Sequence, residues 1–210
     1  MRILWPALLG LGLFTQLVNA RPVSYPGGWT LMSKNDDVRN FIHIHYSPTV
    51  RTSLGYKYED WRDQEFTLNA LQINNLLKRW NQKDSQANLY AKSGLGVANP
   101  DSSGSSEIAG FTGVSADWED RRYFISYENR FTQTESFANF YQQSIRAGLA
   151  PYQGDYGDLH TWLMIELRHR PESADSLTVT PLLRLFKQEH LFETGVSDRG
   201  DVMFNYIYRY

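Results

Sequence analysis

The last nine residues read Val202-Met203-Phe204-Asn205-Tyr206-Ile207-Tyr208-Arg209-Tyr210. Every second position, from Val202 to Tyr210, carries an aromatic or large apolar side chain. The positions between them are mixed and include Asn205 and Arg209. Because successive side chains of a strand point to opposite faces, this spacing predicts a β-strand with one apolar face and one more polar face.

The same alternation recurs upstream along the chain. Segment 41–47 sets apolar side chains against His43 and His45, and three further segments alternate in the same way: 51–59, 159–168 and 177–185. Eleven turn-like clusters of polar, Gly and Pro residues separate such segments and predict twelve strands. The predicted strands lie near 24–33, 39–47, 51–61, 65–80, 86–98, 108–118, 121–132, 139–152, 158–170, 177–187, 190–197 and 201–210.

Two of these segments leave alternatives open. The apolar residues of 66–80 recur at intervals of four and three, which also suits one face of a helix. Segment 24–33 contains Pro26, Gly27 and Gly28, which are poor residues for the interior of a strand. A barrel of ten strands is therefore an alternative to one of twelve.

Alternation does not by itself decide which solvent the apolar face meets. A soluble β-protein turns that face inward, whereas a transmembrane barrel turns it toward lipid. Strands of about ten residues suit a tilted membrane strand. Three further features favour a transmembrane barrel over a soluble β-protein. They are the even strand number, turns of alternating length with the longest at 99–107, and the terminal aromatic Tyr210. We predict an all-β fold, an antiparallel transmembrane β-barrel that forms a single domain over 21–210.

The first twenty residues predict export. Arg2 precedes a short apolar run from Ile3 to Phe14, and Val18-Asn19-Ala20 offers a cleavage site, so we interpret 1–20 as a signal peptide. The chain has no cysteine, which excludes disulfides, thiolate metal sites and a cysteine nucleophile. A formal net charge of −2 gives no general attraction to nucleic acid.

The C-terminal strand resembles the signature by which bacterial outer-membrane barrels are recognised for assembly. The resemblance implies a cell outer-membrane location and a periplasmic C-terminus. Its implied partners are the barrel assembly machinery, outer-membrane lipid and lipopolysaccharide. In size and short turns the chain is also similar to small twelve-stranded porins that pass acidic oligosaccharides, which implies a passive channel.

Charged residues on the inward face are the candidate pore lining. The alternation points nine of them toward the lumen: Lys57, Glu59, Lys92, Glu128, Arg130, Arg146, Glu166, Arg168 and Arg184. These charges either line a narrow pore for small, anionic solutes or pair into a plug. The predicted outer loops, by contrast, are acidic and include Asp36 and Asp37.

His43 and His45 form a His-x-His motif, the most specific local motif in the sequence. Residues i and i+2 of a strand share a face about 7 Å apart, a spacing at which two imidazoles can hold one metal ion. His160 is a third candidate ligand, for Cu²⁺ or Zn²⁺. We expect no catalytic residues, since no nucleophile elbow occurs, and no required cofactor. The predicted functions are a small passive channel or structural barrel, a metal-handling membrane barrel, or a soluble periplasmic binding barrel.

Overall fold

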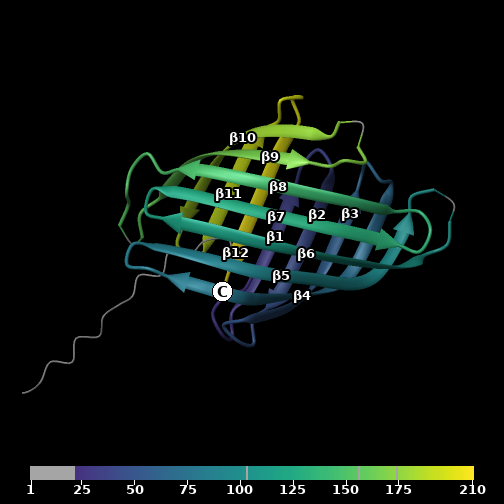
Figure 1. The fold of residues 1–210 in the computed structure, drawn as a ribbon, viewed down its shortest axis with the longest axis horizontal. Helices are drawn as coiled ribbons and strands as arrows, with labels where there is room; N and C mark the ends of the chain where they lie inside the picture. Colours follow the sequence, from purple (N-terminus) through teal and green to yellow (C-terminus); the bar gives the residue numbers. More distant parts are fainter. Residues whose placement is uncertain (1–21, 103, 156, 174) are drawn as a thin grey trace, which may run out of the picture.

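A computed structural model describes residues 22–102, 104–155, 157–173 and 175–210. The predicted signal peptide, residues 1–20, lies outside the described residues. Within them the chain forms twelve β-strands that close into one barrel (Figure 1). The strands are β1 (Trp29–Asn35), β2 (Arg39–Tyr46), β3 (Thr52–Trp61), β4 (Phe66–Asn81), β5 (Ser85–Pro100), β6 (Glu107–Asp120), β7 (Tyr123–Thr134), β8 (Asn139–Leu149), β9 (His160–His169), β10 (Leu177–Lys187), β11 (His190–Val196) and β12 (Val202–Arg209).

Each strand pairs antiparallel with its neighbours in the sequence, and β1 closes the ring against β12. Thr30 stands opposite Arg209 in this closing pair, and the Trp29 amide donates to the Tyr210 carbonyl at 2.6 Å. Closure leaves no free sheet edge, so every strand has a hydrogen-bonding partner on both sides. The twelve-strand prediction is confirmed, and the ten-strand alternative is wrong.

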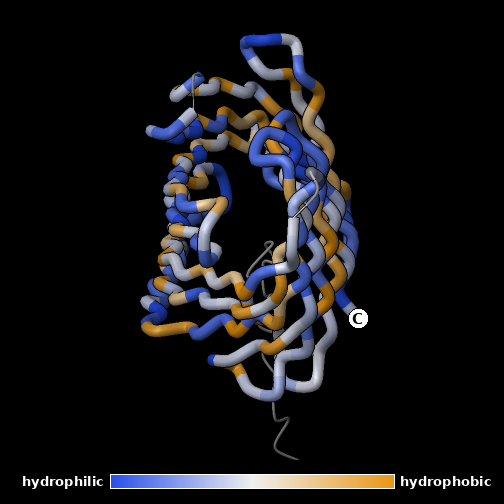
Figure 2. The backbone as a smooth tube through the Cα atoms, turned by 90° about the vertical axis from the view of Figure 1, so that its right-hand side faces the viewer, coloured by the Kyte–Doolittle hydropathy of each residue, from blue (hydrophilic) through white to orange (hydrophobic). Residues whose placement is uncertain are grey.

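The two ends of the barrel are distinguished by their connections. We call the end that carries 36–38, 62–65, 101–102, 104–106, 135–138, 170–173, 175–176 and 197–201 the outer end, and the opposite end, with the C-terminus, the inner end. Seen along the barrel, the backbone is an oval ring in which apolar and polar residues alternate along the strands (Figure 2).

The outward face is apolar and the inward face is largely polar. Outward side chains such as Ile42, Leu95 and Ile108 are more than half exposed, whereas inward ones such as Glu59 and Asn74 are fully buried. A soluble barrel has the reverse polarity, because its core must exclude water. The described residues include no helix that is long and apolar enough to cross a membrane.

Segment 66–81 is a strand, and apolar residues on both of its faces explain its helix-like spacing. Its register against β5 shifts between Leu76 and Lys78, so that Leu77 and Lys78 are both exposed. Before the bulge, Phe66 and Ala70 are buried inside the barrel whereas Ile73 is exposed on the outward face, so the apolar residues already recur at intervals of four and three. The bulge then reverses the alternation and leaves Trp80 exposed. The first strand begins at Trp29 rather than at residue 24, because Gly27 turns the chain with a φ of 85°.

Candidate solute pathway through the barrel

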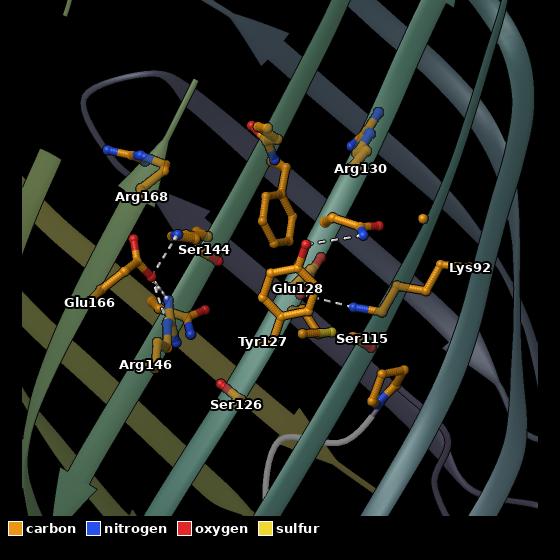
Figure 3. Close-up of a pocket in the computed structure, with 18 of the residues that line it drawn as sticks. Lys92, Ser115, Ser126, Tyr127, Glu128, Arg130, Ser144, Arg146, Glu166 and Arg168 are labelled. Carbon is orange, nitrogen blue, oxygen red and sulfur yellow. Dashed lines mark hydrogen bonds and ion pairs between the residues drawn. The ribbon is translucent and has the colours of Figure 1, made fainter. Parts of the chain in front are cut away.

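The nine charged residues predicted to line a pore all belong to the inward face. Eight of them line a cavity of about 210 Å³ within the barrel, and the ninth, Glu59, is fully buried beside it. Figure 3 shows Arg146, Glu166 and Arg168 on one part of the wall and Lys92, Glu128 and Arg130 on another. The alternation along each strand therefore placed these side chains on the correct face.

Glu59 on β3 is the centre of one ion-pair network, which we call the Glu59 cluster. Its carboxylate accepts two hydrogen bonds from Arg130, at 2.7 and 2.6 Å, and one from Arg39 at 2.7 Å. The Lys57 ammonium lies 2.9 Å from the same carboxylate. Since β4, β5 and β6 separate β3 from β7, the bidentate pair with Arg130 joins distant parts of the barrel wall.

Aromatic rings surround the cations of the Glu59 cluster. The Arg130 guanidinium lies 3.8 Å from the centroid of Phe111, and that of Arg39 lies 4.6 Å from the centroid of Trp61. Trp61 also packs edge-on against Phe140, 4.8 Å away, in an apolar cluster that continues to Phe66. These residues form an apolar layer inside the barrel toward its outer end. The sequence signal was available, because Trp61 shares the alternation of Lys57 and Glu59.

Glu193 on β11 is the centre of a second network, the Glu193 cluster, which the sequence reasoning missed. Its carboxylate accepts hydrogen bonds from Arg184 at 2.7 Å, Arg146 at 3.1 Å and Asn205 at 2.6 Å. Arg146 also donates to Glu166 at 2.5 Å. The residues of this cluster balance two guanidinium groups against two carboxylates and one amide, so its buried charges compensate one another.

The connection between β1 and β2 folds into the lumen instead of standing on the outer rim. Asp36 accepts a hydrogen bond from Arg168 of β9 at 3.0 Å and lies 3.0 Å from the Lys34 ammonium. Asp37 also pairs with Arg168. The expectation that Asp36 and Asp37 decorate the rim is therefore wrong, because the inward-facing Arg168 draws both carboxylates across the barrel.

Asp36 is held as a carboxylate by its surroundings. Burial raises its pKa, but the charges of Lys34, Arg168 and Arg39 outweigh burial, and the Arg39 amide adds a hydrogen bond. The net result is a pKa well below its usual range. The connection is thereby fixed in the lumen by an ionised side chain.

The chain that precedes β1 occupies the inner end of the lumen. The Pro22 carbonyl accepts hydrogen bonds from the Ser53 hydroxyl at 2.7 Å and the Asn74 amide at 3.3 Å. Val23 is buried against Leu76 and Tyr90. The cavity is lined from Pro22 at this end to Val38 near the outer end, so chain segments from both ends of the barrel contribute to its wall.

The histidines do not assemble as a group of three. His43 and His45 lie together on β2 with ring centroids 4.7 Å apart, whereas His160 on β9 contacts Phe186. Four strands, β1, β12, β11 and β10, separate β2 from β9 by the shorter way around the barrel. Among the described residues, no cluster of three or more His, Cys, Asp or Glu is placed to hold a metal ion. Metal binding stays a prediction.

Comparison with known proteins gives a likeness of fold. No protein-family model and no curated protein matches the sequence. Among solved structures, the KdgM porin in complex with disordered oligogalacturonate is 9% identical, with a TM-score of 0.52 over 87% of this chain and 98% of that chain. A second KdgM porin structure is 10% identical, with a TM-score of 0.49 over the same shares. OccAB4 of Acinetobacter baumannii is 13% identical, with a TM-score of 0.42 over 86% of this chain and 56% of that chain.

These observations define the class of the fold. The chain is an antiparallel transmembrane β-barrel of the kind found in small outer-membrane porins, as its terminal strand and alternation predict. At 9% identity the likeness concerns the fold alone.

Proposed function

We propose that this protein is a channel of the bacterial outer membrane through which small solutes diffuse passively, with a preference for anions. The observation that carries the proposal is the charge of the lumen. Among the described residues, the cavity is lined by eight basic side chains against five acidic ones. The basic residues are Lys34, Arg39, Lys57, Lys92, Arg130, Arg146, Arg168 and Arg184, and the acidic ones are Asp36, Asp117, Glu128, Glu166 and Glu193.

A pore lined by guanidinium and ammonium groups favours anions, because each passing anion exchanges part of its hydration for fixed positive charge. The cavity volume of about 210 Å³, and the chain segments that enter the lumen at both ends, limit the solute to a small size. The likeness of fold to the KdgM porin supports the channel proposal. One of these porins is in complex with oligogalacturonate, an acidic oligosaccharide, which agrees with the proposed preference for anions.

The apolar outward face supports a membrane location. Outward positions carry large exposed side chains on strands from every part of the barrel, including Tyr56, Leu71, Ile145 and Leu163. Such a surface is stable in lipid and insoluble in water. This argues against the soluble periplasmic alternative, whose apolar face would be its core.

The test is single-channel recording in planar lipid bilayers with the folded, detergent-purified protein. We expect discrete conductance steps and, in a KCl gradient, a reversal potential that shows chloride to be more permeant than potassium. Protein unfolded by boiling is the control and should give no steps. Folded protein without conductance steps would overturn the channel proposal, and a cation-selective reversal potential would overturn its anion preference.

A further inference from the structure

His43 and His45 are buried polar groups that the ion-pair networks leave unused. His43 is 3% exposed and His45 is fully buried, although both face the lumen. Within the described residues, Nε2 of His43 and both ring nitrogens of His45 have no hydrogen-bond partner. Buried polar nitrogens are ordinarily satisfied, so a pair of adjacent, unsatisfied imidazoles indicates a partner, water or ion, that the protein itself does not supply.

The barrel register adds a third donor beside them. Met32 of β1 stands directly opposite His43 of β2, and both residues line the cavity. Directly opposed residues of an antiparallel pair have Cβ atoms about 5 Å apart, within reach of a thioether and an imidazole. Two imidazoles and one thioether therefore converge on one patch of the lumen wall.

The charges around this patch restrict which ion it can hold. Lys57 stands opposite His43 on β3, and Lys92 also lines the cavity. Both ammonium groups are paired at 2.9 Å, Lys57 with Glu59 and Lys92 with Glu128. The nearby carboxylates are thus engaged by cations, and neutral donors remain. Neutral nitrogen and thioether ligands suit a soft ion of low charge, whereas Zn²⁺ favours thiolate or carboxylate partners in addition to imidazole.

We propose that His43, His45 and Met32 form a binding site for a soft monovalent ion, Cu⁺ or its analogue Ag⁺, in the wall of the lumen. The site differs from the one that the sequence suggested, because Met32 takes the place of His160 and the ion is monovalent. It depends on the register of β1 and β2 and is independent of whether the barrel conducts.

The direct test is titration of the folded barrel, in detergent micelles, with Ag⁺ while the Met methyl groups are observed by NMR. We expect the Met32 methyl signal to shift, whereas Met164 and Met203, on β9 and β12, serve as internal controls and stay unchanged. This measurement uses the unaltered chain, so it does not depend on a variant that folds. An unmoved Met32 signal at saturating Ag⁺ would overturn the site.

Calorimetry of variants tests the ligand set. We expect His43→Ala and His45→Ala each to weaken Ag⁺ binding by at least tenfold and Met32→Leu to weaken it less strongly, while His160→Ala binds as the unaltered protein does. The shift in gel mobility on boiling confirms that each variant is folded. Unchanged Ag⁺ affinity in His43→Ala and His45→Ala would refute the histidine ligands, and tighter binding of Zn²⁺ than of Ag⁺ would refute the soft monovalent class.

Discussion

The Glu59 cluster sets one carboxylate against three cations, whereas the Glu193 cluster balances two carboxylates against two guanidinium groups. Aromatic rings face the cations of the first cluster, at Phe111 and Trp61. In the second cluster, Glu166 remains as a partner for Arg146 if Glu193 is lost. Glu59 therefore has no substitute within its own cluster, and an incoming anion would meet excess positive charge there.

The largest expected effect is on stability at Glu59. We expect Glu59→Gln to lower the free energy of unfolding by about 3–5 kcal/mol, the range for removing one member of a buried ion pair. Glu193→Gln should cost about 1–3 kcal/mol, since Arg146 keeps its pairing with Glu166. Unfolding in urea, followed by tryptophan fluorescence, measures both variants. Equal losses would show that the charge balance of the two clusters does not matter.

The ion pair between Asp36 and Arg168 is a third contact across the lumen, and its contribution to the free energy of unfolding should depend on pH. Asp36→Asn should cost about 2 kcal/mol at pH 7, the value of a hydrogen bond between charged groups. Because the folded-state pKa of Asp36 lies well below the unfolded value, its stabilisation is complete above about pH 5 and decreases progressively as the pH falls from about 4 toward the folded-state pKa.

The measurement is the difference in unfolding free energy between the unaltered protein and Asp36→Asn at pH 7 and pH 3. The gap should shrink at pH 3. A gap that is constant with pH would mean that the Asp36 side chain stabilises the connection by shape rather than by charge. Asp60→Asn is a matched control, since Asp60 lies near the end of β3 and accepts a hydrogen bond from the neutral Asn40 amide.

A substitution at the inner end of the barrel tests the contribution of apolar packing, because Val23 is buried there against Leu76 and Tyr90. Val23→Ser should cost about 1.5 kcal/mol from lost apolar burial and should raise the single-channel conductance, because the chain before β1 would leave the inner mouth more readily. Val50→Ser is the control, since Val50 lies in an exposed turn at the same end. Conductance that rises equally in both variants would show that Val23 packing does not narrow the mouth.

The smallest expected effect is on selectivity, at a pair outside both clusters. Lys92 and Glu128 lie 2.9 Å apart on the lumen wall, so Lys92→Gln and Glu128→Gln break the same contact but change the charge in opposite directions. Each should shift the chloride-to-potassium permeability ratio by about twofold, the influence of one charge about 8 Å away in water, down for Lys92→Gln and up for Glu128→Gln. Shifts of the same sign would mean that structure, rather than charge, sets selectivity.

Two elements show where sequence reasoning about the fold succeeded and where it was inexact. The alternation in 202–210 predicted both the strand and its outward face, since period two survives wherever a strand is regular. In 66–81 apolar residues on both faces, followed by one bulged residue, hide the period of two, and the sequence alone could not separate strand from helix. Hydrogen bonding between β4 and its neighbours decided the question.

For the candidate site, too, the sequence predicted one feature and the tertiary structure decided another. Local sequence was enough to assign the face of each charged residue, because the side-chain direction is a local property of a strand. The partners of these residues follow from the closed barrel instead. Barrel closure brings Arg130 to Glu59 across 71 residues and Arg168 to Asp36 across 132 residues. These contacts depend on the strand number and the register, which no local pattern encodes, because every strand must be in place before the lumen exists.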